Sequence, residues 1–271
     1  MACLRPWGIE TMSLARRILS GLALRLWLPV ALLGGWWLLS AHSGSLYFPP
    51  LRTITVTFGH DWLFRLVPSD VYPSVQNLAL GFALATVGGV AAGTVIAQVG
   101  LLRRALEPFL HFLRSIPPPA LLPFGLVVLG EGASMKVFII AIGAVWPTLL
   151  NTVDGIDGIE PLLADVASVY QLNHRNRLWR VVLPAAGPQI FAGIRTTLQI
   201  SIILMIVSEM VASTGGIGFY VLQSEQSFSI AQMWAGTILI GLLGYLANAG
   251  FSVIEHRALR WQSGQRLSGR A

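Results

Sequence analysis

Long apolar runs dominate this sequence, and short segments that hold most of its charged residues separate them. A run of about 20 apolar residues is long enough to cross a lipid bilayer as a helix. Charged residues make up only 11% of the chain and mean hydropathy is +0.68, whereas about a quarter of a soluble domain is charged. We therefore predict an all-α membrane protein with six transmembrane helices. The predicted spans are residues 26–39, 75–99, 105–129, 136–151, 185–212 and 230–254.

Basic residues are distributed unevenly between the segments that connect these runs. Cytoplasmic segments of membrane proteins carry an excess of lysine and arginine, so we predict that both termini are cytoplasmic. The predicted domains are an N-terminal segment 1–25, a six-helix transmembrane domain 26–255 and a tail 256–271. This orientation explains the pI near 10.2 better than nucleic-acid binding does. Thirteen of the 18 basic residues lie on the predicted cytoplasmic side, namely Arg5, Arg16, Arg17, Arg25, Arg103, Arg104, Arg175, Arg177, Arg180, Arg257, Arg260, Arg266 and Arg270.

The first apolar run has an alternative interpretation as a cleaved signal peptide. The cleavage site that it offers, Ala41-His42-Ser43, is a poor one, and the basic leader is long. We therefore favour a first transmembrane helix with its N-terminus inside. The single cysteine, Cys3, excludes a disulfide framework.

A polar interruption, residues 154–184, separates the fourth and fifth runs. Glu160 before Pro161 predicts a helix start, because proline fits the first helical position and an acid there meets the helix dipole. We predict a short amphipathic helix over Pro161–Asn173 on the cytoplasmic side, followed by Arg175, Arg177 and Arg180. Such a helix between two spans indicates a docking surface. Its apolar residues at helical spacing are Leu162, Val166, Val169 and Tyr170.

Small residues recur every four positions in the second run, at Ala85, Gly89, Gly93 and Ala97. Small residues on one helical face let a neighbouring helix approach closely. We interpret this face as a packing surface.

The third run contains Arg114 and the consecutive prolines Pro117, Pro118 and Pro119. Three prolines cannot continue a helix, so this span must break near 117–119. Broken backbone at membrane depth survives only beside protein or a water-filled cavity. A translocation pathway next to residues 114–123 is one interpretation, and a kink that merely curves the helix bundle is the other.

Two charged residues, Arg195 and Glu209, lie within the fifth run. Charges within spans usually face the bundle interior or a cavity. Both are candidates for lining or gating a pathway, and a structural polar pair or an end-of-helix anchor is the alternative. Arg195 lies toward the cytoplasmic side, where it can snorkel or bind a carbonyl oxygen, and Glu209 lies toward the opposite end.

The sequence offers no catalytic or metal-binding motif. Lys136 is the only lysine, and its neighbours Met135 and Val137 exclude the Gly-Lys-Ser/Thr of a nucleotide-binding loop. The five histidines are scattered without metal-ligand spacing, and no serine lies in a Gly-x-Ser-x-Gly elbow. We predict a chain that is not an enzyme, that has no cofactor or metal of its own, and that depends on a partner for energy.

The polar interruption resembles the EAA loop of binding-protein-dependent ABC importer permeases. That pattern is Glu-Ala-Ala, three residues, Gly, eleven residues, Leu-Pro. Here Asp165-Val166-Ala167, Gln171 and Leu183-Pro184 keep the spacing, and Asp165, Val166 and Gln171 depart from the pattern. Three further stretches resemble the nitrate, sulfonate and taurine branch of this family. They are residues 114–123, Trp146–Asn151, and Glu209 followed by Gly215-Gly216-Ile217-Gly218.

The resemblance implies the transmembrane domain of a type I ABC importer in the bacterial inner membrane. Two permease copies, as a homodimer, would form the pathway. Two ATPase subunits that use ATP and Mg would dock below, and a periplasmic or lipid-anchored binding protein would deliver a sulfonate, taurine, nitrate or similar small solute. The residues implied in ATPase coupling are Leu162, Asp165, Val166, Ala167, Val169, Tyr170, Gln171, Arg175, Leu183 and Pro184. The pathway candidates are Arg114, Pro117, Pro118, Arg195 and Glu209.

Two other classes of protein remain open on the residues alone. A secondary carrier driven by an ion gradient typically has broken helices in matching halves, and only one clear break, near Pro117, is present here. A non-transporting membrane scaffold would also bind partners through a basic loop, but it would not need that break or Glu209.

Overall fold

The computed structural model describes residues 14–40 and 47–260, and within these ranges the chain is helical and contains no strand. The all-α prediction is confirmed for this part of the chain. Cys3, the Ala41-His42-Ser43 site and the tail beyond Arg260 lie outside the described residues. The chain divides into two compact units, Met1–Val56 and Thr57–Ala271. The first unit contains α1 (Leu14–Ser40), which includes the predicted first span, and the beginning of α2 (Leu51–His60).

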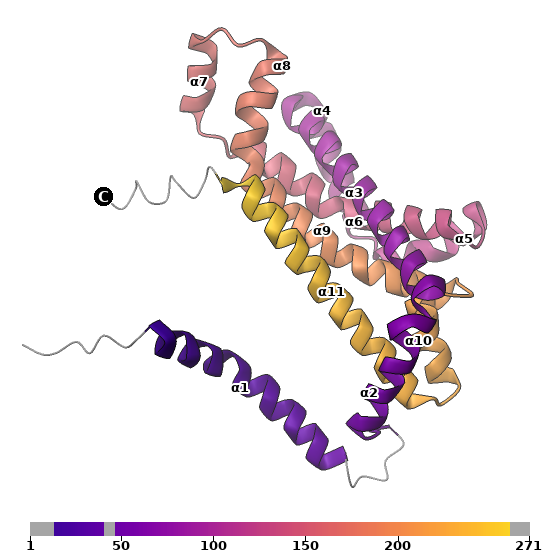
Figure 1. Cartoon of the computed structure of the whole chain (residues 1–271). Coiled ribbons are helices and arrows are strands. Elements are labelled where there is room, and N and C mark those ends of the chain that lie inside the picture. The colour runs from indigo at the N-terminus through magenta and orange to yellow at the C-terminus, as the bar shows by residue number, and fades with distance from the viewer. Residues whose placement is uncertain (1–13, 41–46, 261–271) are drawn as a thin grey trace, which may run out of the picture. The chain divides into compact units, whose positions relative to one another are not determined.

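Four helical stretches of the second unit are long and apolar enough to cross a membrane (Figure 1). A fifth follows if the bent pair formed by α4 (Gly100–Arg114) and α5 (Leu122–Leu129) is one span. The first predicted span coincides with a shorter apolar helix, Trp27–Ser40. The chain is therefore a multi-pass membrane protein, and six spans stay a prediction. The four stretches contain α3 (Tyr72–Gln98), α6 (Ala133–Asp157), α9 (Leu183–Val211) and α11 (Ile230–Ala258).

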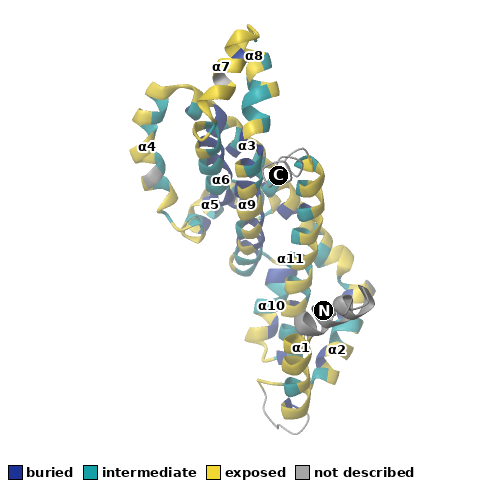
Figure 2. Cartoon of the chain, turned by 90° about the vertical axis from the view of Figure 1, so that its left-hand side faces the viewer, coloured by how far each residue is buried: buried dark blue, intermediate teal, exposed yellow. Residues whose placement is uncertain are grey.

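The core lies where α3, α6 and α9 meet, with α6 packed along both of the others. Figure 2 shows the buried residues gathered at this junction. The predicted small-residue face of α3 contacts α6 here, which confirms the packing interpretation. An added Cβ would lie 2.9 Å from Thr148 Cβ at Gly89, and 2.7 Å from the Leu149 carbonyl oxygen at Gly93. Only glycine allows the two backbones to come this close.

The third predicted span is broken where the prolines are. Helix α4 ends at Arg114, a short 3-10 turn covers Pro118–Leu121, and α5 then leaves at 87° to α4. Pro118 packs against α6 at Gly143, where an added Cβ would lie 2.7 Å from Pro118 Cβ. The predicted break near 117–119 is confirmed, and Pro118 takes part in helix packing.

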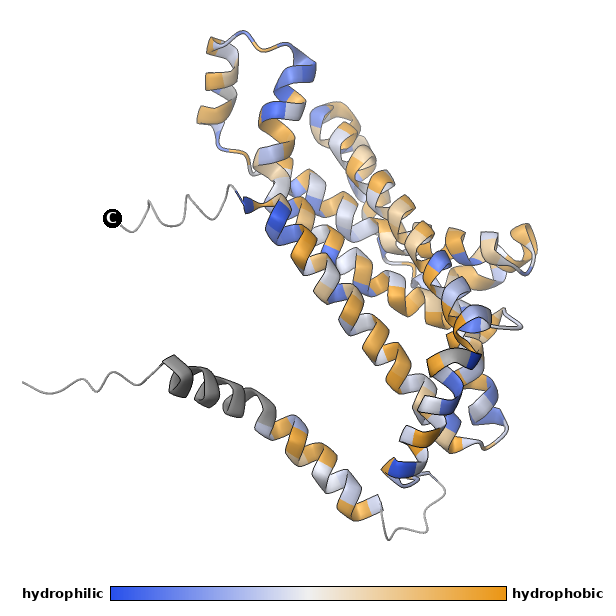
Figure 3. Ribbon diagram, in the orientation of Figure 1, coloured by the Kyte–Doolittle hydropathy of each residue, from blue (hydrophilic) through white to orange (hydrophobic). Residues whose placement is uncertain are grey.

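Helix α10 (Ile217–Gln226) packs against α9 and α11. Little of α11 is buried in the single chain, and its surface is strongly apolar (Figure 3). Lipid or another protein must cover such a surface in a membrane.

Candidate functional site

The segment that joins α6 to α9 extends beyond one end of the bundle (Figure 1). It contains α7 (Pro161–Val169), α8 (His174–Arg177) and the π-helical turn η4 (Leu178–Val182), which leads directly into α9. We call residues 158–182 the α7 loop. The helix predicted over Pro161–Asn173 is too long, because α7 ends at Val169.

Both ends of α7 are set by local backbone chemistry. Glu160 has an extended conformation, with φ −57° and ψ 131°, and Pro161 occupies the first turn as predicted. At the other end, the Gln171 N–H donates to the Ser168 carbonyl at 2.9 Å, and the Leu172 N–H donates to the Ala167 carbonyl at 3.2 Å. These two bonds form a Schellman motif, which stops the helix.

Gln171 has φ +50°, the left-handed conformation that glycine adopts most readily. It occupies the position where the EAA pattern has its glycine. The turn therefore keeps the shape that the glycine would give, at an energetic cost for a residue with a Cβ.

The apolar side chains predicted to form a docking face are exposed in the single chain. The exposed fraction is 79% for Val169 and 75% for Tyr170, and Leu162 and Val166 are also exposed. Leu163, which the spacing argument missed, extends this face. Exposed apolar side chains gathered on one short helix mark a protein or membrane contact. Figures 2 and 3 show α7 as an exposed and largely apolar helix.

The other residues predicted for coupling have different environments. Asp165 and Arg175 are exposed, and neither belongs to an ion pair in the described part of the chain. Ala167 is 2% exposed and is therefore buried in the single chain. Leu183 packs against the core, and Pro184 lies in the first turn of α9. The Leu-Pro pair therefore anchors the loop to the bundle.

Arg114 lies at the end of α4 beside a cavity of about 230 Å³. Arg103, Glu107 and Asp154 line the same cavity, and Arg103 also forms an ion pair with Asp157 of α6 at 2.5 Å. Charges of both signs therefore meet where the bent pair faces α6. Pro117, at the break, is exposed. Whether Arg114, Pro117 and Pro118 line a pathway stays a prediction.

Arg195 of α9 forms an ion pair with Glu255 of α11. This contact matches the structural polar pair that was the alternative for Arg195, and a pathway role stays a prediction. The sequence analysis did not identify its partner, Glu255. The sequence signal for this pair was the presence of opposite charges in two apolar helices, because charged residues within spans usually pair with one another. The pair links α9 to α11.

Glu209 is fully buried near the other end of α9. Its carboxylate accepts hydrogen bonds from Ser74 Oγ of α3 at 2.6 Å and from the Gly218 N–H of α10 at 3.0 Å. An added Cβ at Gly216, which has φ +108°, would lie 2.6 Å from Glu209 Cδ. The Gly215–Gly218 turn thus wraps around the carboxylate. These contacts match the structural alternative for Glu209, and a pathway role stays a prediction.

Further polar contacts surround Glu209. Asp70 accepts from the Gly216 N–H at 2.8 Å, and Lys136 Nζ donates to Ser213 Oγ at 2.7 Å. Asp61 accepts from the Tyr220 hydroxyl at 2.6 Å, and burial together with this bond raises the pKa of Tyr220. We call this set the Glu209 cluster. It consists of Asp61, Asp70, Ser74, Lys136, Glu209, Ser213, Tyr220 and the backbone of residues 215–218.

Sequence reasoning missed all members of this cluster except Glu209 and its glycine turn. Ser74 and Glu209 are 135 residues apart, and Asp61 and Tyr220 are 159 residues apart. No local pattern connects residues at such separations. Within the described residues, no group of three or more His, Cys, Asp or Glu is placed to hold a metal ion.

Residues 85–260 match the family described as the binding-protein-dependent transport system inner membrane component. The chain belongs to this family. Its relatives include the nitrate import permease protein NrtB of Leptolyngbya laminosa, 32% identical over 190 residues, which are 70% of this chain and 68% of that protein. The bicarbonate transport system permease protein CmpB of Synechococcus elongatus is 34% identical over 188 residues, covering 69% and 68% of the two chains. The putative aliphatic sulfonates transport permease protein SsuC of Bacillus subtilis is 30% identical over 215 residues, covering 79% and 78%.

The fold is also similar to that of a solved transporter. A chain of the MetNI methionine ABC transporter, in an inward-facing conformation, superposes with a TM-score of 0.62 at 21% identity. The match covers 72% of this chain and 97% of the MetNI chain. The predicted family is confirmed. The protein is an ABC importer permease from the branch that contains nitrate, sulfonate and bicarbonate permeases, and it is the membrane subunit of a transporter.

Proposed function

We propose that this permease forms the translocation pathway for a small anion and is driven through the α7 loop by a separate ATPase. In this proposal two copies of the chain assemble in a bacterial inner membrane. Two ATPase subunits bind on the α7 side, where ATP and Mg are used, and a periplasmic or lipid-anchored binding protein delivers the anion on the Glu209 side. Both termini of the permease are cytoplasmic.

The exposed apolar face of α7 carries this proposal. Fully burying one such side chain contributes about 1.5–3 kcal/mol, so covering the exposed face of Leu162, Val166, Val169 and Tyr170 in an apolar groove favours docking. Asp165 and Arg175 are free for polar contacts at its rim. The loop is also connected mechanically, because the helix from His174 continues through η4 to Val211.

This continuity suggests how ATP hydrolysis moves the permease. When the ATPase subunits close, α7 moves with them, and the helical stretch His174–Val211 transmits the movement into the core. Packed helices shift as rigid bodies between discrete arrangements. The result is a pathway that opens alternately toward each side of the membrane.

The proposed substrate class comes from the relatives, which are permeases for nitrate, bicarbonate and aliphatic sulfonates. The charged groups described within the apolar helices are largely engaged inside the chain. Lys136 bonds Ser213, Arg195 pairs with Glu255, and Glu209 is enclosed. A pathway without a strong site of its own fits a transporter whose selectivity lies in the binding protein.

The proposal is tested by co-purifying the ATPase with Tyr170→Ser and with the control Tyr72→Ser. Both tyrosines are exposed, by 75% and 66%, but Tyr72 lies at the start of α3, at the Glu209 end. We expect Tyr170→Ser to lower ATPase recovery about tenfold, since a large apolar contact is lost, and Tyr72→Ser to leave it unchanged. Equal recovery with both variants would count against α7 as the docking element.

A further inference from the structure

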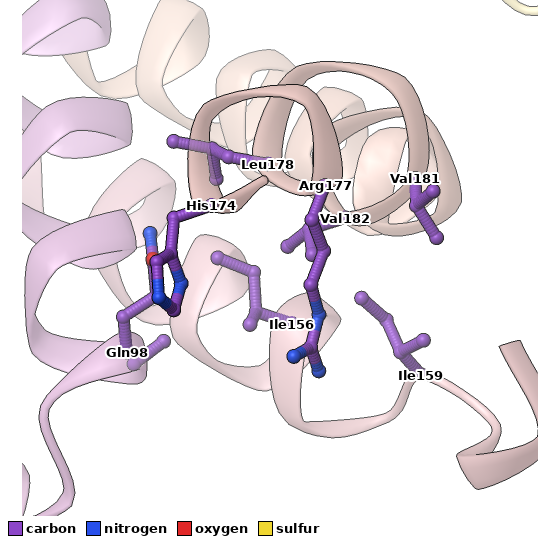
Figure 4. A pocket seen from close by; sticks show the side chains of 9 residues that line it. Gln98, Ile156, Ile159, His174, Arg177, Leu178, Val181 and Val182 are labelled. Atoms are coloured by element: carbon purple, nitrogen blue, oxygen red, sulfur yellow. The ribbon is translucent and has the colours of Figure 1, made fainter. Parts of the chain in front are cut away.

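A second cavity, of about 420 Å³, lies beside the α7 loop (Figure 4). Its lining comes from the ends of three candidate membrane spans. Gln98 is the last residue of α3, Ile156 is next to the last residue of α6, and His174 is the first residue of the stretch His174–Val211. The cavity therefore occupies one level of the bundle, where the apolar helices end and the loop begins.

The lining combines positive charge with apolar walls. Figure 4 shows the Arg177 side chain reaching between Ile156 and Ile159, and the His174 ring beside the Gln98 amide. None of the described residues that line this cavity is acidic. Arg177 also has no ion pair in the part of the chain that the structure describes. A guanidinium group with no carboxylate beside it is suited to bind an external anion.

We propose that this cavity binds the phosphate headgroup of an anionic phospholipid. Arginine binds phosphate with charge-assisted, often bidentate hydrogen bonds. The ends of membrane spans lie at the depth of the lipid headgroups, and basic pockets between spans on the cytoplasmic side are known to hold such headgroups. The apolar walls of Ile156, Ile159 and Val182 suit the glycerol and the first acyl carbons.

Lipid binding here adds a regulatory element to the proposed function. Arg177 lies in α8, which connects α7 to η4 and α9. A bound headgroup holds α8 against the ends of α3 and α6, so it stiffens the connection through which α7 moves α9. The anionic lipid content of the membrane then tunes the efficiency of coupling. The binding step itself requires no ATPase, so it can fail or succeed independently of the proposed function.

The test uses the full purified chain in mild detergent, with bound lipid counted by native mass spectrometry. Phosphatidylglycerol is the anionic lipid and phosphatidylcholine the zwitterionic one, at equal concentrations. Arg177→Gln is compared with Arg180→Gln, which removes the same charge from an exposed position outside the cavity. We expect Arg177→Gln to weaken phosphatidylglycerol retention about tenfold, and Arg180→Gln to leave it unchanged. Phosphatidylcholine retention should be the same in all three proteins.

A second variant, Arg177→Lys, distinguishes loss of the lipid contact from loss of folding. It keeps the charge but loses the bidentate geometry, so an intermediate loss of about threefold is expected. Equal losses in Arg177→Gln and Arg180→Gln would show attraction to surface charge alone and would overturn the proposal, as would no loss in either. Two further results would also overturn it. One is inorganic phosphate binding with the same dependence on Arg177 in the absence of lipid. The other is reduced ATPase recovery in Arg177→Gln with unchanged lipid retention.

Discussion

The two ends of α9 differ in which side chains they expose and which they bury. At the α7 end, apolar side chains such as Val169 and Tyr170 are exposed, and α7 is held by backbone bonds within its own loop. At the other end, the Glu209 cluster buries polar side chains and gives each a partner in the same chain. An exposed apolar surface requires a partner, whereas a satisfied buried polar network requires none. We infer from this comparison that the α7 loop docks on a partner protein and that the Glu209 cluster holds α3, α9 and α10 together.

The largest effect is expected from Glu209→Ala, because it removes the acceptor shared by Ser74 Oγ and the Gly218 N–H. Leaving the buried Gly218 N–H unsatisfied, together with the cavity left by the removed side chain, lowers the free energy of unfolding by about 3 kcal/mol. Ser74 Oγ keeps its hydrogen bond to the Asp70 carbonyl oxygen at 2.7 Å. Thermal unfolding of the purified permease in detergent measures this as a fall in Tm. An unchanged Tm would contradict the claim that the Glu209 cluster holds α3, α9 and α10 together.

A slightly smaller effect is expected from Gly216→Ala, since the added Cβ would lie 2.6 Å from Glu209 Cδ at a φ of +108°. Strain at such a position costs about 2 kcal/mol. Gly215→Ala is the matched control, because its Cβ would have no neighbour nearer than Asp70 Oδ1 at 3.8 Å. Its Tm should stay close to that of the unmodified protein. Equal losses in the two variants would show that the turn does not depend on wrapping the carboxylate.

At the α7 end, we expect a substitution to weaken ATPase association and to leave the Tm of the permease nearly unchanged. Val169→Asp places a charge in the exposed apolar face, so ATPase association should weaken by about tenfold or more. The Tm of the isolated permease should stay nearly constant, because surface changes alter stability by about 0.5 kcal/mol or less. Pull-down of the ATPase and thermal unfolding of the same preparation separate the two quantities. A fall in Tm without weaker ATPase association would show that Val169 stabilises the permease itself, and it would contradict the docking role of the α7 end.

The smallest effect is expected from Gln171→Gly. Glycine adopts the φ of +50° without the penalty for a Cβ, which is about 1 kcal/mol. The α7 loop should therefore open less often, and trypsin should cleave after Arg175 and Arg177 more slowly. Gln171→Ala should be cleaved at the original rate, since alanine retains the Cβ. Faster cleavage of the glycine variant would mean that added backbone freedom outweighs the relief of strain.

Local sequence patterns predicted the parts of this fold that local chemistry determines. The Glu160-Pro161 start of α7, the break at Pro117–Pro119 and the close packing at Gly89 and Gly93 all follow from residue types and spacing. The end of α7 did not follow, because the apolar spacing continues to Tyr170 and a glutamine at position 171 gives no turn signal.

The partners in long-range pairs did not follow from local sequence patterns. Glu255 is 60 residues from Arg195 along the chain, and Ser74 is 135 residues from Glu209. Only the packing of α3, α9 and α11 brings these groups together. In the same way, the exposure of Val169 was predictable as one face of an amphipathic helix, but the burial of Ala167 was not.

The central claim, that α7 docks on an ATPase, is tested most directly by site-specific cross-linking in native membranes. Cys3 is the only cysteine, so a Cys3→Ser background accepts single probes. Val169→Cys and the control Tyr72→Cys would each carry a photoactivatable maleimide reagent. The account predicts an adduct with the ATPase subunit from Val169→Cys and none from Tyr72→Cys. No ATPase adduct from Val169→Cys, or equal adducts from both positions, would contradict it.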